Sequence, residues 1–572
     1  TITHVVRVRH IGEAGGTDTF SLTLSGGGWP AQVNPSTVTL APCSAAFVTV
    51  TIQVPLTATW DAHDALTLTA TSIVSPAASA SVVLSHKTPA GILLVDDDRF
   101  FDKEDDYLDA LAAYGNSADR WSTRGGDAAQ GPPLDVLRMY PLVIWFNAYD
   151  WFSPLSAGEL ERLGAYLEGG GRAMLSSQAA LYYLEGHPAL ARYFGLAGID
   201  FTDATSNVVG APGHAIGVGY AGGTLLTGLG GRFPYNWNLS TAVQPVQTAG
   251  VVVRGDSGQP FGLAQAGLAS GPRFTPNFQG ALAPEQWRAV LLPWAFETLE
   301  PSARRALMNR IVGWLSWLGE SSLAADAPDA SPGQQVTFTL AVQLDPVRAS
   351  SPLTAVVSLS ATLAGEGALV GSSLPAFVPP ADAGSWHGVI TAGQRLSWTF
   401  VAQVLATATA GSALTATAFF SLDEVGIRFV KSASVRVGGP TLTAALQLSD
   451  SAPRWGDRIT ATVVLTNLGA TLAPSATLDA VVPTGLILLT DTVSGPGTGD
   501  LRVAGNRLTW RGPLDSGAAI SVTYAFTLPR FMPSPDAYYH AVMFGQQGRY
   551  EGQRDAWIIP RTWRGWLPIT RR

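Results

Sequence analysis

The sequence predicts a multidomain, mainly β protein that contains three β-sandwiches and one α/β domain with a parallel sheet. The chain has 572 residues, which is more than one hydrophobic core normally unites. Short runs of alternating apolar and polar residues, broken by turns, fill residues 1–89, 320–438 and 439–560. Residues 90–319 instead alternate apolar runs with helical segments, a rhythm typical of a parallel sheet covered by helices.

The first sandwich is expected from five alternating runs within residues 1–89. They are HVVRVRH, TDTFSLTLSG, AAFVTVTIQVP, DALTLTATS and SASVVLSH. Successive residues of a strand face opposite sides of its sheet, so runs of this length and spacing are typical of a sandwich with one buried face per sheet.

The α/β domain is expected from a different set of segments. GILLVDDD (91–98) and LVIWFNA (142–148) are predicted parallel strands, and PLSAGELERLGAYLEGG (154–170) is a predicted helix that ends at glycine. GRAMLSSQ follows as a strand and its turn. The domain closes with a helix in residues 300–319, whose predicted apolar face consists of Ala306, Leu307, Ile311, Trp314 and Leu315.

An alignment of internal repeats matches the start of the chain with the second strand of each later sandwich. With Ile459 beneath Ile2, the other matched pairs are Val6 with Val463, Val8 with Leu465 and Gly12 with Gly469; Val336 falls in the same register. In the later sandwiches an apparent first strand precedes this one, such as TLTAALQLS at 441–449. Nothing precedes it at Thr1, so we expect the first sandwich to lack its first strand and to present an open edge.

The C-terminal segment is the expected partner of that edge. Residues 561–572 follow the last sandwich as an arginine- and tryptophan-rich tail. The residues expected to form the subunit interface are Ile2, Val6, Val8, Trp557, Ile559, Trp563, Trp566, Leu567, Ile569 and Arg571. Strand addition of this kind runs head to tail and builds a filament. In the alternative, the chain is part of a longer precursor and the tail folds back on its own domain; Pro560 and Pro568 disfavour a long ladder.

Composition excludes several functions. The 43 acidic and 35 basic residues give a net charge of −8, which argues against a nucleic-acid partner because phosphates need a basic surface. Cys43 is the one cysteine and the eight histidines are scattered, which excludes a disulfide framework and a zinc cage. No apolar run approaches the roughly 18 residues of a membrane-spanning helix.

Two of the sandwiches resemble domains of bacterial secreted proteins. Residues 17–55, TDTFSLTLSGGGWPAQVNPSTVTLAPCSAAFVTVTIQVP, resemble their Ig-like repeats, and VVLTNLG, DAVVPTGLILL and ISVTYAFTLP resemble the conserved-repeat domains of bacterial surface proteins. The resemblance implies secretion to the cell surface or beyond, in a structural or adhesive setting. Cys43 stands at a corner where the pattern usually has glycine, so we expect it to be a turn residue.

The α/β domain resembles the class I glutamine-amidotransferase-like superfamily, which has a flavodoxin-like fold. GILLVDDD, YPLVIWFNAYDW, LERLGAYLEGGGRAMLSSQ and VLLPWAFETL carry the resemblance. It implies a nucleophilic cysteine at the turn after the third of these strands, where this chain has Ser176 and Ser177. We therefore expect no catalysis from this domain. The alternative is a serine hydrolase in which His187 or His214 is the base for one of these serines.

Acidic residues follow the first predicted parallel strand, at the sheet edge where α/β proteins bind ligands. Because clustered carboxylates repel one another, one hypothesis is a Ca²⁺ site formed by Asp96, Asp97, Asp98 and Asp102. The alternative is that Asp102 and Glu104 cap the next helix and favour its dipole, while the others are solvated. No other cofactor is expected.

These observations favour a non-catalytic, secreted structural protein that polymerises with itself as the subunit of an extracellular filament or surface layer. The alternative function is an accessory or targeting region of a secreted protease or glycan-active enzyme. A cell-surface glycan is a further candidate partner, because Trp145, Trp151, Tyr235 and Trp237 supply flat rings, although most tryptophans are expected to be core anchors.

Overall fold

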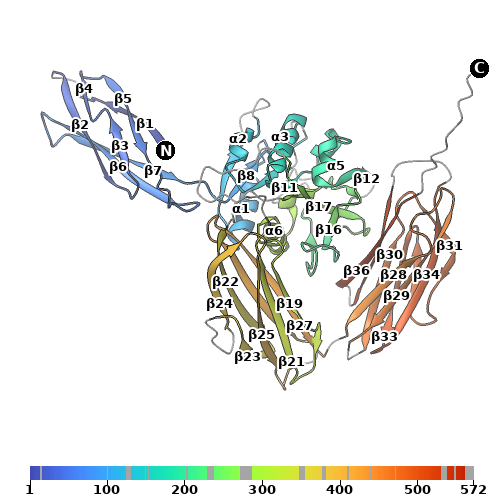
Figure 1. Cartoon of the computed structure of the whole chain (residues 1–572). Helices are drawn as coiled ribbons and strands as arrows, with labels where there is room; N and C mark the ends of the chain where they lie inside the picture. Colours follow the sequence, from blue (N-terminus) through green and yellow to red (C-terminus); the bar gives the residue numbers. More distant parts are fainter. Residues whose placement is uncertain are drawn as a thin grey trace, which may run out of the picture. The chain divides into compact units, whose positions relative to one another are not determined.

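The computed structural model describes most of the chain, and its described parts form two compact units, the first built mainly from Thr1–Gly91 and the second from most of the remainder. Strands dominate in Figure 1, which confirms the mainly β prediction. The described residues are 1–12, 16–99, 101–123, 130–148, 150–151, 154–200, 204–227, 238–270, 286–346, 354–375, 382–408, 411–438, 440–469, 472–529, 537–546 and 549–560.

The first unit is a sandwich of two sheets with strand orders β1-β5-β3 and β4-β2-β6-β7. Apolar residues from alternate positions of both sheets, such as Val50, Ile52 and Leu66, form its core. Its strands are β1 (Ile2–Arg9), β2 (Asp18–Gly26), β3 (Ala31–Asn34), β4 (Thr37–Leu40), β5 (Ala45–Ile52), β6 (His63–Ser72) and β7 (Ser79–Lys87).

The α/β region begins the second unit with the predicted parallel strands. The parallel half of its sheet has the order β9-β8-β10-β11-β18. These strands are β8 (Ile92–Asp96), β9 (Ala118–Ser122), β10 (Leu142–Phe146), β11 (Arg172–Ser176) and β18 (Gln286–Leu292). Every residue of β8, β10 and β11 is buried, as expected for central strands of a sheet covered on both faces, whereas no residue of edge strand β9 is fully buried.

The same sheet continues as antiparallel strands, which the sequence did not predict. β17 pairs antiparallel with β18, and β16, β13 and β14 extend the sheet. They are β13 (Asn207–Gly210), β14 (Gly223–Thr224), β16 (Gly250–Arg254) and β17 (Pro260–Leu268), while β12 (Leu196–Asp200) and β15 (Ala242–Pro245) form a separate pair. The sheet is therefore mixed, because the chain between β11 and β18 adds antiparallel strands beside β18.

Local signals explain the helices. α3 starts with a capping box, in which Ser156 N donates to Glu159 Oε2 (2.8 Å) and Glu159 N donates to Ser156 Oγ (3.3 Å). The helices are α1 (Glu104–Ala112), α2 (Leu134–Leu137), α3 (Ala157–Glu168), α4 (Ala180–Tyr183), α5 (Pro188–Phe194), the 3₁₀ turn η1 (Phe296–Thr298) and α6 (Pro301–Leu315). Helices within the described ranges include none long and apolar enough to cross a membrane.

The predicted closing helix, α6, is buried more widely than one face. Leu307, Ile311 and Leu315 are buried as expected, but Met308 and Val312 are buried too. The reason is that α6 packs against α1 and the α/β sheet and also against strand β27 of the following sandwich. A helix between two partners needs apolar residues on more than one side.

Two further sandwiches complete the second unit. The middle one has the sheets β19-β21-β25-β23 and β20-β27-β26-β22-β24, and the last one has β28-β29-β34-β31 and β32-β33-β30-β35-β36. The middle strands are β19 (Ser322–Ala325), β20 (Asp329–Ala330), β21 (Gln335–Gln343), β22 (Thr354–Gly365), β23 (Gly367–Ser372), β24 (Asp382–Thr391), β25 (Arg395–Val404), β26 (Ala413–Leu422) and β27 (Ile427–Val437). The last strands are β28 (Leu442–Leu448), β29 (Arg458–Asn467), β30 (Ala473–Val481), β31 (Ile487–Ser494), β32 (Asp500–Ala504), β33 (Arg507–Leu514), β34 (Ala519–Thr527), β35 (Tyr538–Gln546) and β36 (Arg549–Ile558).

Candidate functional site

One sheet of each sandwich has the same strand order, and in the first sandwich the described residues provide no outermost strand for it. β1, β5 and β3 occupy the places of β21, β25 and β23 in the middle sandwich and of β29, β34 and β31 in the last one. Outside those strands lie β19, paired with β21, and β28, paired with β29. Within the described part of the chain, β1 pairs with β5 and no strand lies on its other side. Among the described residues, β1 is therefore an edge strand of its sheet.

The inward side chains of β1 are less covered than their equivalents. Ile2 and Val6 are only partly buried, and Val8 is 9% exposed. The equivalent residues of the two later sandwiches are all 0% exposed: Val336, Leu340 and Val342 in β21, and Ile459, Val463 and Leu465 in β29. An added strand beside β1 would cover apolar surface that the first sandwich leaves accessible.

Asn467 holds the first strand of the last sandwich in place through hydrogen bonds, and a different residue aligns with it in the first sandwich. Asn467 Oδ1 accepts hydrogen bonds from Thr441 N (3.1 Å), directly before β28, and from Gly469 N (3.0 Å). In the repeat register His10 takes the place of Asn467. The Nδ1 atom of His10 is buried and has no hydrogen-bond partner among the described residues. A docking strand would give this nitrogen a partner.

A second histidine lies on the inward face of β1. The ring of His4 is 5.7 Å from that of His86 between centroids, and its Nε2 is buried without a hydrogen bond from the described residues. Burial, followed by the charge of His86, lowers the pKa of His4. His86 Nε2 in turn lies 3.2 Å from Asp64 Oδ2. The inward face of β1 thus carries a polar ring that favours its neutral form.

Two of the expected C-terminal interface residues, Trp557 and Ile559, lie in or directly after β36, and the others lie outside the described residues. Trp557 lies in β36, which pairs with β35 of the same sandwich, and its ring is 5.0 Å from that of Tyr539. Ile559 N donates to Ser451 O (2.9 Å), although the Ile559 side chain remains exposed. Trp557 is thus part of the last sandwich, as the predicted boundary at residue 560 implies, and its place in a subunit interface stays a prediction. Trp563, Trp566, Leu567, Ile569 and Arg571 lie outside the described residues.

At the carboxyl end of β8, Asp96 and Asp98 converge with Glu104 from the first turn of α1. One carboxylate oxygen from each residue lies within 4.8 Å of the other two. Arg120 on β9 bridges two of them, through Nε to Asp96 Oδ2 (2.9 Å) and Nη1 to Glu104 Oε1 (2.6 Å). The sequence predicted Asp96 and Asp98 as members of this cluster. Glu104 and Arg120 lie farther along the chain, and the fold brings them beside these two residues.

The other two predicted metal ligands do not join this group. Asp97 Oδ2 accepts hydrogen bonds from Trp145 Nε1 (3.0 Å) and Asn147 Nδ2 (2.7 Å), on the opposite side of the strand from its neighbours. Alternate residues of an extended chain face opposite ways, which separates Asp97 from them. Asp102 is exposed. The four-residue Ca²⁺ set is therefore corrected, with Asp97 and Asp102 outside it.

Several carboxyls at this sheet edge favour their protonated forms. Burial raises the pKa of Asp97 to about 7, and burial together with the charge of Asp96 raises the pKa of Asp98 to about 8. Burial also raises the pKa of Glu297 to about 7, where Tyr107 OH donates to Glu297 Oε2 (3.0 Å). Glu297 was not predicted from the sequence, although residues that soon follow a parallel strand often line a ligand site.

The alternative role of the acidic run, in starting the helix, is confirmed in part. Glu104, Asp105 and Asp106 form the acidic first turn of α1 and favour its dipole. The N-cap is Lys103, and no side chain caps it. Asp102 is therefore not the helix cap that this alternative expected.

Ser176 and Ser177, at the turn after β11, form hydrogen bonds with backbone groups rather than with a general base. Ser176 Oγ donates to Trp294 O (2.9 Å) and accepts from Phe296 N (3.1 Å), and Ser177 Oγ accepts from Ala180 N (3.0 Å). Both serines are fully buried. These bonds fix the strand-to-helix turn.

Neither candidate histidine is bonded to these serines in the described structure. His214 lies against Trp314, with 5.1 Å between ring centroids, and burial lowers the pKa of His214 to about 4. His187 Nδ1 accepts from Ala189 N (3.3 Å) and caps α5. The geometry gives the serine-hydrolase hypothesis no support.

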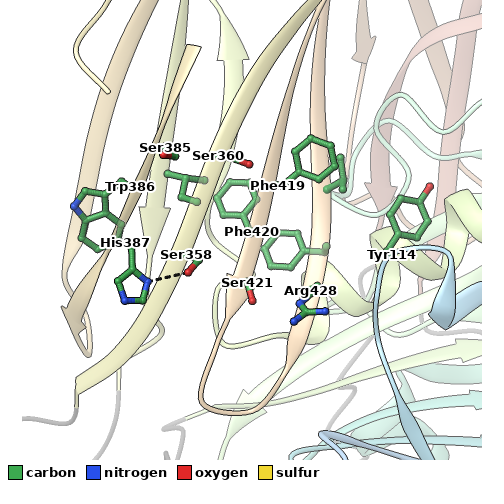
Figure 2. Close-up of a pocket in the computed structure, with 13 residues that line it drawn as sticks. Tyr114, Ser358, Ser360, Ser385, Trp386, His387, Phe419, Phe420, Ser421 and Arg428 are labelled. Carbon is green, nitrogen blue, oxygen red and sulfur yellow. Dashed lines mark hydrogen bonds between the residues drawn. The ribbon is translucent and has the colours of Figure 1, made fainter. Parts of the chain in front are cut away.

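A groove lies on the outer face of the middle sandwich, over β22, β24, β26 and β27 (Figure 2). Its volume is about 410 Å³, and the ring of Phe419, 47% exposed, contributes to its lining. Ser358 Oγ lies 2.9 Å from His387 Nδ1 and donates to Asp423 Oδ2 (2.5 Å). Since the serine lies between histidine and carboxylate, this is not the histidine-centred order of a catalytic triad.

Comparison with known proteins gives no family. No protein-family model matches the sequence, and no curated protein matches it either.

Solved structures with some likeness include three from bacteria, at 9–11% sequence identity. The C-terminal domain of the AgI/II polypeptide BspA of Streptococcus agalactiae (11% identity, TM-score 0.17) matches 42% of this chain over 100% of its own length. The MSCRAMM ACE of Enterococcus faecalis (9%, 0.17) matches 42% of this chain and 94% of its own. BcpA, the major pilin subunit of Bacillus cereus (9%, 0.19), matches 29% and 58%. At TM-scores this low, the likeness supports no conclusion about this chain.

Proposed function

We propose that this chain is a non-catalytic extracellular structural protein, the subunit of a filament or surface layer that grows by adding a strand to the open edge of β1. One observation carries the proposal: β19 and β28 cover this position in the other two sandwiches, while β1 has no such neighbour among the described residues. Open edges with partly exposed apolar residues bind further strands.

The proposed occupant is the segment 561–572 of a neighbouring copy. Twelve residues are enough to span an eight-residue edge strand. Leu567 and Ile569 alternate as Leu442 and Ala444 do in β28, whose inward side chains are buried. Pro568 is compatible with an edge position, because such a strand bonds to its single neighbour through alternate residues.

The α/β region is proposed to be a flavodoxin-like domain that has lost catalysis. Its parallel strands follow the order 2-1-3-4-5, which is one of the two common orders of doubly wound sheets. The turn that carries the nucleophile in the resembled superfamily holds Ser176 here, and its hydroxyl bonds to the backbone. A domain of this kind would have a structural role rather than a catalytic one.

Cysteine cross-linking tests the assembly. In a Cys43→Ser background, copies carrying Thr3→Cys on β1 are mixed with copies carrying Thr570→Cys and then oxidised. We expect disulfide-linked dimers of the two kinds, and no assembly after deletion of residues 561–572. The matched control is Ser81→Cys, exposed on edge strand β7 of the opposite sheet, which should not cross-link. Equal cross-linking at Ser81, or unchanged assembly after the deletion, would reject the proposal.

The groove in Figure 2 favours glycan binding as a second candidate function. An exposed ring can stack on a sugar face, and the hydroxyls of Ser360 and Ser385, which line the groove, can form hydrogen bonds with it. Retention of the chain on immobilised bacterial polysaccharide should be lost in Phe419→Ala and kept in Val389→Ala, a control on the same sandwich. Equal retention of both variants, or none by the unmodified chain, would dismiss this function.

A further inference from the structure

We propose that Asp96, Asp98 and Glu104 form a Ca²⁺ site at the carboxyl end of β8. All three side chains are buried, with residue exposures of 2%, 2% and 8%. Each contributes one carboxylate oxygen to a cluster that spans no more than 4.8 Å. This spacing allows one cation to contact all three oxygens, since Ca²⁺–oxygen bonds are about 2.3–2.6 Å long.

A second observation points to a missing ligand at this cluster. Asp96 Oδ1 and Glu104 Oε2 are buried and have no hydrogen-bond partner among the described residues. Buried carboxylate oxygens without a donor cost free energy, and a bound cation would remove that cost. Three further oxygens of the cluster have partners: Arg120 bonds to Asp96 Oδ2 and Glu104 Oε1, and Lys103 N donates to Asp98 Oδ2 (3.0 Å).

The burial of the cluster favours Ca²⁺ over Mg²⁺. Mg²⁺ keeps several water ligands and usually takes one or two carboxylates, whereas Ca²⁺ accepts several carboxylates and backbone carbonyls. Three buried carboxylates leave little access for water. The competing occupant of the cluster is a proton shared between Asp96 and Asp98, and the experiment distinguishes the two.

Arg120 competes with the cation for the negative charge of the same two carboxylates, since it bonds to Asp96 Oδ2 and Glu104 Oε1. Its side chain is 35% exposed, so it can turn toward solvent while its strand stays in place. In the cation-free state the guanidinium neutralises part of the acidic charge. When Ca²⁺ binds, that positive charge becomes unfavourable at the site, so removing it should strengthen cation binding.

The test is calorimetric titration of Ca²⁺ into the full chain after treatment with a chelator. We expect one Ca²⁺ per chain at this cluster, together with a rise in melting temperature. Asp98→Asn should weaken binding at least about tenfold, because it removes a ligand charge while keeping the shape. Arg120→Gln should strengthen binding several-fold, and Asp109→Asn, on the exposed face of α1, should leave it unchanged.

Two results would overturn the proposal. One is the absence of binding heat and of a melting shift in the unmodified chain at millimolar Ca²⁺, which would leave the shared proton as the occupant. The other is Ca²⁺ binding by Asp98→Asn with the affinity of the unmodified chain. If Asp98→Asn fails to fold by circular dichroism, Arg120→Gln decides alone, and unchanged or weaker binding by that variant rejects the site. None of these results depends on assembly through β1.

Discussion

Cys43 adopts a backbone conformation that glycine adopts more easily. Its φ is 62°, in the left-handed region where a side chain is strained by about 1–2 kcal/mol. This explains why the resembled repeats usually have glycine at that corner. We expect Cys43→Gly to be neutral or to stabilise the first sandwich by up to about 1 kcal/mol, since the extra freedom of glycine offsets part of the relief.

The matched variant at the same position is Cys43→Val, whose β-branched side chain tolerates this conformation poorly. Calorimetric melting of the full chain should rank glycine above cysteine and cysteine above valine. A valine variant as stable as the glycine variant would show that the corner carries no strain.

Two buried histidines make stability depend on pH. Burial lowers the pKa of both His540 and His214 to about 4, while the ordinary value is 6.5. Below pH 6.5 these histidines bind protons in the unfolded chain but stay neutral in the folded chain. Their contribution to stability is therefore complete above pH 6.5 and is lost as the pH falls toward 4. The loss should reach roughly 2 kcal/mol per histidine at pH 5.

His540→Gln should remove this dependence for the last sandwich. In the folded chain, His540 Nε2 lies 2.7 Å from Tyr524 OH and Nδ1 lies 3.0 Å from Val481 O, and glutamine can keep one of these bonds. Urea unfolding at pH 7 and pH 5 measures the difference. If the variant loses as much stability as the unmodified chain between these values, His540 is not the source.

At the scale of elements, the sequence predicted the strands and helices whose signals lie within a few neighbouring residues. The apolar runs of β8, β10 and β11 and the Ser156–Glu159 capping box are signals carried within a few residues. The antiparallel strands β13, β16 and β17 depend on pairing with distant segments, so the sequence pattern did not reveal them.

The candidate sites, too, were predictable only where the signal lies in a local sequence pattern. The open edge could be predicted because the inward residues of β1 and β29 match in register. The acidic cluster could be predicted only in part: alternation along the strand separates Asp97 from Asp96, and Arg120 reaches Asp96 from another strand.

Asn467 should hold β28 in place. It is fully buried, and besides accepting from Thr441 N and Gly469 N it donates from Nδ2 to Leu514 O (2.9 Å). Asn467→Ala leaves these backbone groups without partners and should lower the free energy of unfolding of the last sandwich by about 2–4 kcal/mol. Hydrogen exchange should also quicken in β28. Protection of β28 equal to that in the unmodified chain would contradict this role.

At the scale of the whole molecule, a buried ion network links the α/β sheet to the middle sandwich. Asp345, after β21, accepts from Arg172 Nη2 (2.7 Å) on β11 and from Arg288 Nη2 (3.3 Å) on β18. All three residues are buried. Burial lowers the pKa of Arg172 to about 10, and the charge of Asp345 opposes that shift.

Removing Asp345 alone should destabilise the second unit strongly. Asp345→Leu leaves two buried guanidiniums without their shared carboxylate and should cost about 3–5 kcal/mol. The double variant Arg172→Met, Asp345→Leu should recover part of that loss, because one uncompensated charge is removed. Urea unfolding of the full chain measures both. A double variant less stable than Asp345→Leu would contradict this account.

Assembly depends on whether the outer side of β1 accepts a strand. The direct measurement is hydrogen–deuterium exchange of residues 2–9 in a chain that lacks residues 561–572, with and without a synthetic peptide of those twelve residues. We predict that the peptide slows exchange of the β1 amides that face away from β5 and leaves β7 unchanged. Exchange in β1 that is equally fast with and without saturating peptide would contradict the proposed assembly.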